Sequence, residues 1–198
     1  MFVYEKKLQY PVRIKNSNPK LAAAIISQYG GPDGELGASL RYLSQRYSMP
    51  YPELKGMLTD IGTEELGPLE MVGTIVHQLT RNLTEQQIKD AGFEAYFVDH
   101  TTGVFPQFAS GYPWSAATMQ VTGDTIADLT EDLAAEQKAR VTYDNILRLS
   151  DDPDVTDAIR FLRAREIVHF QRFGEGLRLV KDRLGEKNVY YMNPSFDQ

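Results

Sequence analysis

Three segments of this chain carry apolar residues at helical spacing, and a glutamate interrupts each apolar stripe near its centre. The segments and their interruptions are 58–79 with Glu65, 126–147 with Glu136, and 159–180 with Glu166. Residues three or four positions apart share one face of a helix, so each glutamate lies on the side that packs against other helices. Burying several carboxylates together is costly unless cations compensate them. The pattern therefore predicts a helical bundle with a cluster of carboxylates in its core.

Metal ions are one form of compensation that helical bundles use. Dinuclear carboxylate proteins hold two ions with a Glu from each of two helices and a Glu-x-x-His pair from each of the other two. Glu166 and His169 form one such pair, and Glu35 places a carboxylate on the remaining helix. Oxygen-rich sites with one or two imidazoles suit manganese or iron. The chain contains no cysteine, which excludes a thiolate zinc site and a disulfide framework.

Ion pairs with arginine offer a second explanation of these glutamates. The candidate pairs are Glu136 with Arg140, and Glu65 or Glu166 with Arg163 or Arg165. Such pairs account for two carboxylates in one layer of a bundle, but not for four.

The composition limits the partners and the location of the chain. Its net charge of -6 provides no basic surface for nucleic acid or anionic lipid. The first residues lack the apolar core of a signal peptide, and no run of about 18 apolar residues occurs. We therefore expect an intracellular protein with no membrane anchor and no nucleic-acid partner.

Local sequence signals predict one all-α domain over 1–198, a ferritin-like four-helix bundle with a short N-terminal arm and a long irregular crossover loop. Asn18-Pro19 is a helix start, and Thr84 with Gln87 forms a capping box. We expect an arm over 1–17, a bundle over 19–184 and an aromatic tail over 188–198. Within the bundle, a kink at 30–34 precedes helices over 35–47, 52–79, 84–92, 124–149 and 155–184. The crossover occupies 93–123, and Gly185 is expected to stop the last helix. Exposed aromatic residues in the crossover and the tail indicate packing between subunits.

Longer stretches carry a specific resemblance across nearly the whole chain. They are 7–10 (KLQY), 30–35 (GGPDGE), 42–45 (YLSQ), 60–65 (DIGTEE), 135–140 (AEQKAR) and 161–169 (FLRAREIVH). Together they resemble the manganese catalase family, in particular its short spore-coat (CotJC-type) branch. The resemblance implies two manganese ions that cycle between divalent and trivalent states while hydrogen peroxide is converted to water and dioxygen. It also implies a homo-oligomer, a hexamer, located in the spore coat, with other coat proteins as further partners.

The resemblance also implies roles for individual residues. Glu65 resembles the carboxylate that bridges both metals, and Glu35 resembles the terminal carboxylate of one of them. Glu136 and His169 resemble the terminal ligands of the other metal. Glu166 resembles a nearby carboxylate that handles protons. Tyr42, seven residues after Glu35 and on its face, resembles the phenol that orients it.

Position 68 departs from the family pattern, in which the residue three after the bridging glutamate supplies an imidazole. Here that residue is Pro68, which offers no donor atom and costs about 3 kcal/mol inside a helix. His77 lies about 18 Å further along the helix at 1.5 Å per residue. His100, in the long loop, is the remaining candidate for a replacement ligand.

Three functions remain open from the sequence. The first is a working dimanganese catalase with an altered site. The second is a catalase-like coat protein that has weak or no activity and is retained for assembly. The third is a site that holds iron or another metal and has a different oxidase or storage role.

Overall fold

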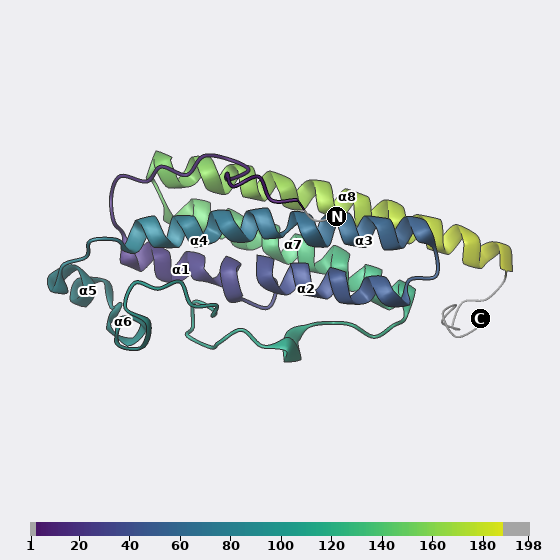
Figure 1. Ribbon diagram of the computed structural model, residues 1–198, viewed down its shortest axis with the longest axis horizontal. Helices are drawn as coiled ribbons and strands as arrows, with labels where there is room; N and C mark the ends of the chain where they lie inside the picture. Colours follow the sequence, from purple (N-terminus) through teal and green to yellow (C-terminus); the bar gives the residue numbers. More distant parts are fainter. Residues whose placement is uncertain (1–2, 188–198) are drawn as a thin grey trace.

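The computed structural model describes residues 3–187, and four long helical rods form its body (Figure 1). Two rods are single helices, and each of the other two is a pair of helices placed end to end. The first rod is α1 (Pro19–Gly30) with α2 (Glu35–Gln45), the second is α3 (Pro52–Glu64) with α4 (Leu66–Thr80), and the others are α7 (Thr125–Leu149) and α8 (Pro153–Lys187). Helix α1 packs against α4, α2 packs against α3, and α7 packs against α8.

A long crossover connects the two pairs of rods. After α4, the chain forms α5 (Glu85–Ala91) and α6 (Glu94–His100) at one end of the bundle. Residues 101–124, with the short 3₁₀ turn η2 (Ala116–Thr118), then run along the outside of α1 and α2 to the opposite end, where α7 begins (Figure 1). This connection makes α7 start at the end of the bundle where α2 ends and α3 begins (Figure 1). The prediction of a four-helix bundle with a crossover is confirmed.

The kink between α1 and α2 depends on glycine. A Cβ atom at Gly30 would lie 2.3 Å from the backbone nitrogen of Gln107, so only glycine lets the crossover pass this close. A Cβ atom at Gly34 would lie 2.6 Å from the carbonyl oxygen of Ser27. Gly34 is the N-cap residue of α2, and Glu35 is its first helical residue. The kink therefore brings Glu35 to the middle of the bundle, where its side chain is buried.

The second rod also breaks at its centre, and this corrects the prediction of one helix over 52–79. Helix α3 ends at Glu64, α4 begins at Leu66, and Glu65 lies between them with helical φ and ψ of -64° and -20°. Pro68 is in the first turn of α4, where backbone N–H groups need no partner inside their own helix. The interior penalty expected for Pro68 is thereby avoided.

The apolar core is divided into two clusters by a polar layer. One cluster fills the end formed by α1, α4, the last part of α7 and the first part of α8. The other fills the end formed by α2, α3, the first part of α7 and the last part of α8. The buried polar residues between them include Glu35, Glu65, Glu136, Glu166 and His169.

The remaining elements agree with the local signals in part. Thr84 and Gln87 form the predicted capping box of α5, and Asp124 caps α7. The stretch predicted to be irregular contains α6, and α8 continues through Gly185 to Lys187, so the predicted stop at Gly185 is wrong. The aromatic tail over 188–198 lies outside the described residues. Among the described helices, none has the length and apolar character needed to cross a bilayer.

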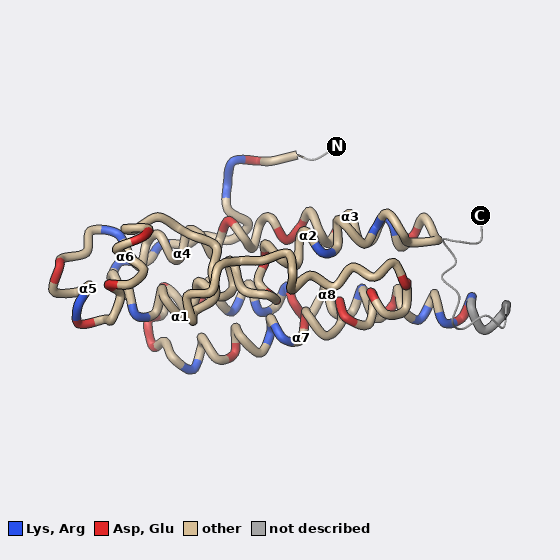
Figure 2. The backbone as a smooth tube through the Cα atoms, turned by 90° about the horizontal axis from the view of Figure 1, so that it is seen from below, with Lys and Arg blue, Asp and Glu red and all other residues tan. Residues whose placement is uncertain are grey.

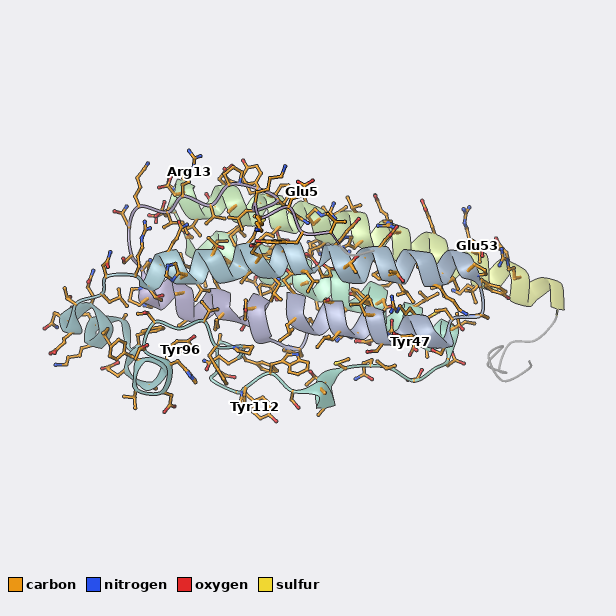
Figure 3. The ribbon with its side chains drawn as sticks, in the orientation of Figure 1. Glu5, Arg13, Tyr47, Glu53, Tyr96 and Tyr112 are labelled. Atoms are coloured by element: carbon orange, nitrogen blue, oxygen red, sulfur yellow. The ribbon has the colours of Figure 1, made fainter. Side chains whose placement is uncertain are left out.

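Charge is distributed unevenly over the outside of the bundle. Figure 2 shows Lys, Arg, Asp and Glu spread along the rods, whereas the crossover carries none of them from residue 101 to residue 123. Tyr112, in this uncharged stretch, points outward (Figure 3) and is 57% exposed.

Candidate metal centre

Three ligand side chains converge in the polar layer from three different rods. Glu65 lies at the break between α3 and α4, Glu136 on α7, and His169 on α8. One ligand atom from each lies within 4.8 Å of the others, and all three side chains are buried. His169 Nδ1 is 2.9 Å from Glu65 Oε1 and 3.6 Å from Glu136 Oε2. The fold therefore brings together residues that are up to 104 positions apart along the chain, from 65 to 169.

Glu35 and Glu166 complete the acidic layer. Burial raises the pKa of Glu35 well above its usual value, and the neighbouring charge of Glu65 raises it further. Burial also raises the pKa of Glu166, with added contributions from the charges of Glu35, Glu136 and Glu65. Four carboxyl groups therefore share one small region from which water is excluded.

Two tyrosines donate hydrogen bonds to these carboxylates, and their pairing corrects one expectation. The Tyr42 hydroxyl donates to Glu136 Oε1 at 2.5 Å, not to Glu35 as the resemblance implied. The Tyr143 hydroxyl donates to Glu35 Oε1. Tyr143 lies seven residues after Glu136, on the same helix face, so the sequence pattern contained a signal for its role.

The arginines do not compensate the buried glutamates. Arg140 and Arg163 both bind Asp144, and Arg165 binds Glu64 at 2.6 Å. All three pairs are partly exposed. The explanation by ion pairs with Arg140, Arg163 or Arg165 is therefore wrong for this cluster.

His169 is the only imidazole in this group of converging ligands within residues 3–187. Burial by itself would lower the pKa of His169, but the charge of Glu65 and close contacts with Glu136, Glu64 and Glu65 raise it to about 12. The metal-free cluster therefore holds an imidazolium against the surrounding carboxyl groups. A bound metal cation would take over this compensating role.

Within residues 3–187, no replacement ligand occupies the place of the imidazole expected near Glu65. Pro68 is buried on the same face of the second rod. His77 is exposed. His100 stacks on Phe105 with ring centroids 4.0 Å apart, beside Tyr96, which lies outside the rods (Figure 3). The expectation that His100 folds over the site is wrong.

The donor atoms fit a metal ion. Both carboxylate oxygens of Glu65 are buried and have no hydrogen-bond partner, and the same holds for Glu136 Oε2, Glu166 Oε1 and His169 Nδ1. Buried polar atoms are rarely left without a partner in a folded protein. Carboxylate oxygens with one imidazole nitrogen are a donor set suited to manganese or iron.

Two further aspartates on α7 provide a matched test of buried carboxylates. Asp128 Oδ1 accepts hydrogen bonds from the backbone nitrogen and the hydroxyl of Thr122, at 2.9 and 2.6 Å. Asp128 Oδ2 accepts one from the Gly123 nitrogen at 3.1 Å. Both oxygens of Asp132, one turn later, are buried without a hydrogen bond. Burial raises the pKa of Asp132 well above its usual value.

Asp132→Asn is expected to raise the thermal unfolding midpoint at pH 7, whereas Asp128→Asn should lower it. Because the folded-state pKa of Asp132 is raised, ionisation of this group destabilises the fold as pH rises above about 4. Asparagine does not ionise, so the increase in the unfolding midpoint should disappear near pH 4. Asp128→Asn weakens several hydrogen bonds at a cost of about 1–3 kcal/mol. Scanning calorimetry from pH 4 to 8 measures both, and a destabilised Asp132→Asn variant at pH 7 would contradict this account.

A bundle of four helical rods with a crossover and a central layer of glutamates and histidine defines a ferritin-like helical protein. The family model described as "Manganese containing catalase" matches residues 1–192. The chain therefore belongs to the manganese-containing catalase family.

Individual relatives agree with this assignment. Protein CotJC of Bacillus subtilis is 51% identical over 190 residues, which cover 96% of this chain and 100% of CotJC. A probable manganese catalase of Clostridium acetobutylicum is 36% identical, covering 95% of this chain and 84% of the relative. The crystal structure of KatB, a manganese catalase from Anabaena, superposes with a TM-score of 0.85 at 33% identity, covering 91% of this chain and 81% of KatB.

Proposed function

We propose that this protein disproportionates hydrogen peroxide to water and dioxygen at a manganese centre in the polar layer. The observation that carries the proposal is the convergence of Glu65, Glu136 and His169, with buried donor atoms that have no hydrogen-bond partner. Membership of the manganese-containing catalase family supports the same chemistry.

The positions of the donor atoms support a role for each ligand. Glu65, Glu136 and His169 would hold one ion, with Tyr42 fixing Glu136 through its hydrogen bond. Glu35, fixed by Tyr143, would hold a second ion together with Glu65. This second position lacks an imidazole because Pro68 stands three residues after Glu65. We therefore expect it to bind manganese more weakly than the first.

Glu166 is the proposed proton carrier. With both metal positions occupied, manganese would supply the two electrons of each half-reaction, one from each ion, by cycling between the divalent and trivalent states. Reduction of one peroxide to two waters consumes two protons, and oxidation of a second peroxide to dioxygen releases two. The raised pKa of Glu166 lets its buried carboxyl hold a proton at a pH where an exposed glutamic acid has lost it. Glu166 can thus keep protons in the site between the two halves of the reaction.

Metal analysis combined with dioxygen measurement tests the proposal. We expect purified protein grown with manganese to contain at least about one manganese per chain and to release one dioxygen for every two peroxides consumed. His169→Ala should lose both properties. If the wild-type protein released no more dioxygen than His169→Ala, the catalase proposal would be rejected.

A structural role in the spore coat is the second candidate. Pro68 in place of a ligand favours weak or absent turnover, and CotJC is similar over its whole length. This role predicts an assembled protein with negligible dioxygen release, whatever its metal content. Iron in place of manganese, for an oxidase or storage role, would appear in the same metal analysis.

Assembly of the protein into a homo-oligomer, a hexamer, also remains a proposal. The uncharged crossover with the exposed Tyr112 supports a contact between subunits, because aromatic residues are enriched at protein interfaces. Light scattering of the purified protein gives the mass directly.

A further inference from the structure

The two ring nitrogens of His169 face different surroundings. Nδ1 faces the buried carboxylates of Glu65 and Glu136. Nε2 lies 3.1 Å from Glu64 Oε2 and 3.2 Å from Arg165 Nη2. His169 therefore has a candidate metal ligand atom on one side and two competing hydrogen-bond partners on the other.

A metal can bind His169 only after the imidazolium of the metal-free protein has lost one proton, and Glu64 and Arg165 would then select opposite tautomers of the neutral ring. If Nε2 carries the proton, it donates to Glu64, and the lone pair of Nδ1 is free to bind a metal. If Arg165 donates to Nε2 instead, the neutral ring carries its proton on Nδ1, where it blocks a metal. The residue that controls Nε2 therefore controls whether Nδ1 can act as a ligand.

Neighbouring arginines hold Glu64 in the position where it contacts His169 Nε2. Arg165 Nη2 donates to Glu64 Oε2 at 2.6 Å, which is shorter than its distance to His169. Arg172 Nη1 lies 3.5 Å from the same oxygen. Glu64 Oε2 thus contacts both Arg165 and the imidazole of His169, so that Arg165 is paired with Glu64.

The position of Glu64 also separates His169 from solvent. Glu64 and Arg165 line a groove of about 570 Å³ between the N-terminal arm and helices α4 and α8. The Glu64 side chain is 38% exposed, whereas His169 is 0% exposed. Glu64 is thus a partly exposed residue in contact with the outer nitrogen of a buried ligand.

We propose that Glu64 is a positioning residue that keeps the His169 proton on Nε2, away from Arg165, and thereby presents Nδ1 to the metal. Glu64 directly precedes Glu65 in the chain, but no motif in the sequence marks it. The proposal rests on the proposed metal site. Partners of this kind, which orient a ligating histidine, typically change metal affinity by about 10–100-fold.

Manganese(II) affinity, measured by the electron paramagnetic resonance signal of free manganese during titration, tests the proposal without using activity. Glu64→Ala should bind manganese about 10–100-fold more weakly than the wild type. Glu64→Gln retains an acceptor oxygen and should bind at an intermediate strength. Arg165→Met should bind like the wild type, and adding it to Glu64→Ala should recover most of the lost affinity.

Asp60→Ala is the matched control, because Asp60 pairs with Arg172 between the same two helices without touching His169. It should leave manganese affinity unchanged. If Arg165→Met were as weak as Glu64→Ala, or if the double variant recovered nothing, Glu64 would act only as a link between helices and the proposal would fail.

The outcomes separate this proposal from the proposed function. Wild-type protein that binds manganese but releases no dioxygen would reject catalase function and leave the Glu64 comparison intact. Equal affinity in wild type and Glu64→Ala would reject the role of Glu64 and leave catalase function standing. Wild-type protein that binds no manganese would overturn both.

Discussion

The Pro68→His variant is expected to bind about two manganese ions per chain, where the wild-type protein binds about one firmly. Pro68 is buried in the first turn of α4, three residues after Glu65 and on the same face. An imidazole there would create the second Glu-x-x-His pair of a dinuclear bundle site. It would join Glu35 and Glu65 at the metal position that lacks an imidazole. Manganese content after dialysis and dioxygen release are the two measurements, and both should be higher than in the wild type.

The Pro68→Ala variant distinguishes the effect of a new ligand side chain from the effect of the restored backbone N–H. Alanine restores the backbone N–H at position 68, as histidine does, but supplies no donor side chain. It should therefore leave metal content near the wild-type level. If Pro68→Ala raised manganese content as much as Pro68→His, the helix break would limit metal binding, and the missing imidazole would not.

The Glu65→Gln variant is expected to lose its manganese while its metal-free form becomes more stable. Both oxygens of Glu65 are buried without a hydrogen-bond partner, and the side chain is 1% exposed. In the metal-free protein four carboxyl groups surround a single imidazole. Glutamine preserves the volume, removes one charge, and replaces an anionic ligand that touches the centre of the cluster.

The sign of the stability change follows from the pKa of Glu65. Burial raises this pKa above its usual value, with the charge of His169 opposing the shift and that of Glu136 adding to it. Ionised Glu65 therefore destabilises the metal-free fold once pH exceeds about 4.5, and the gain in Glu65→Gln should be present at pH 7 and vanish near pH 4. In a chain of this size, each 1 kcal/mol shifts the unfolding midpoint by about 2–4 °C.

Glu70→Gln provides the control for Glu65→Gln. Glu70 lies on α4, shortly after the break at Glu65, but its carboxylate accepts a hydrogen bond from Tyr4 at 2.5 Å outside the cluster. Its replacement should leave manganese content unchanged. If Glu65→Gln kept the manganese content of the wild type, Glu65 would not be a ligand. If its metal-free form unfolded at a lower midpoint than the metal-free wild type at pH 7, the electrostatic explanation would be refuted.

Local patterns predicted most of the helices because the interactions that start and stop a helix lie within a few residues. The side chain of Asn18 accepts from the Leu21 nitrogen at 3.0 Å, as an N-cap residue does. The same approach failed at two places in the long helices. The sequence did not reveal the break at Glu65 or the continuation of α8 through Gly185.

The sequence by itself determined which helix faces meet in the core. Periodicity places Glu65, Glu136, Glu166 and His169 on buried faces, and burying carboxylates without cations is too costly to occur by accident. The structure brings these faces together in one polar layer.

Only the tertiary structure decided which atoms meet within that layer. Periodicity fixes the face of a helix but not its axial shift or rotation against its neighbours. A shift of one residue moves a side chain by about 1.5 Å along the axis and about 100° around it, more than a hydrogen bond tolerates. For this reason Tyr42 binds Glu136, Tyr143 binds Glu35, and the outer nitrogen of His169 meets Glu64.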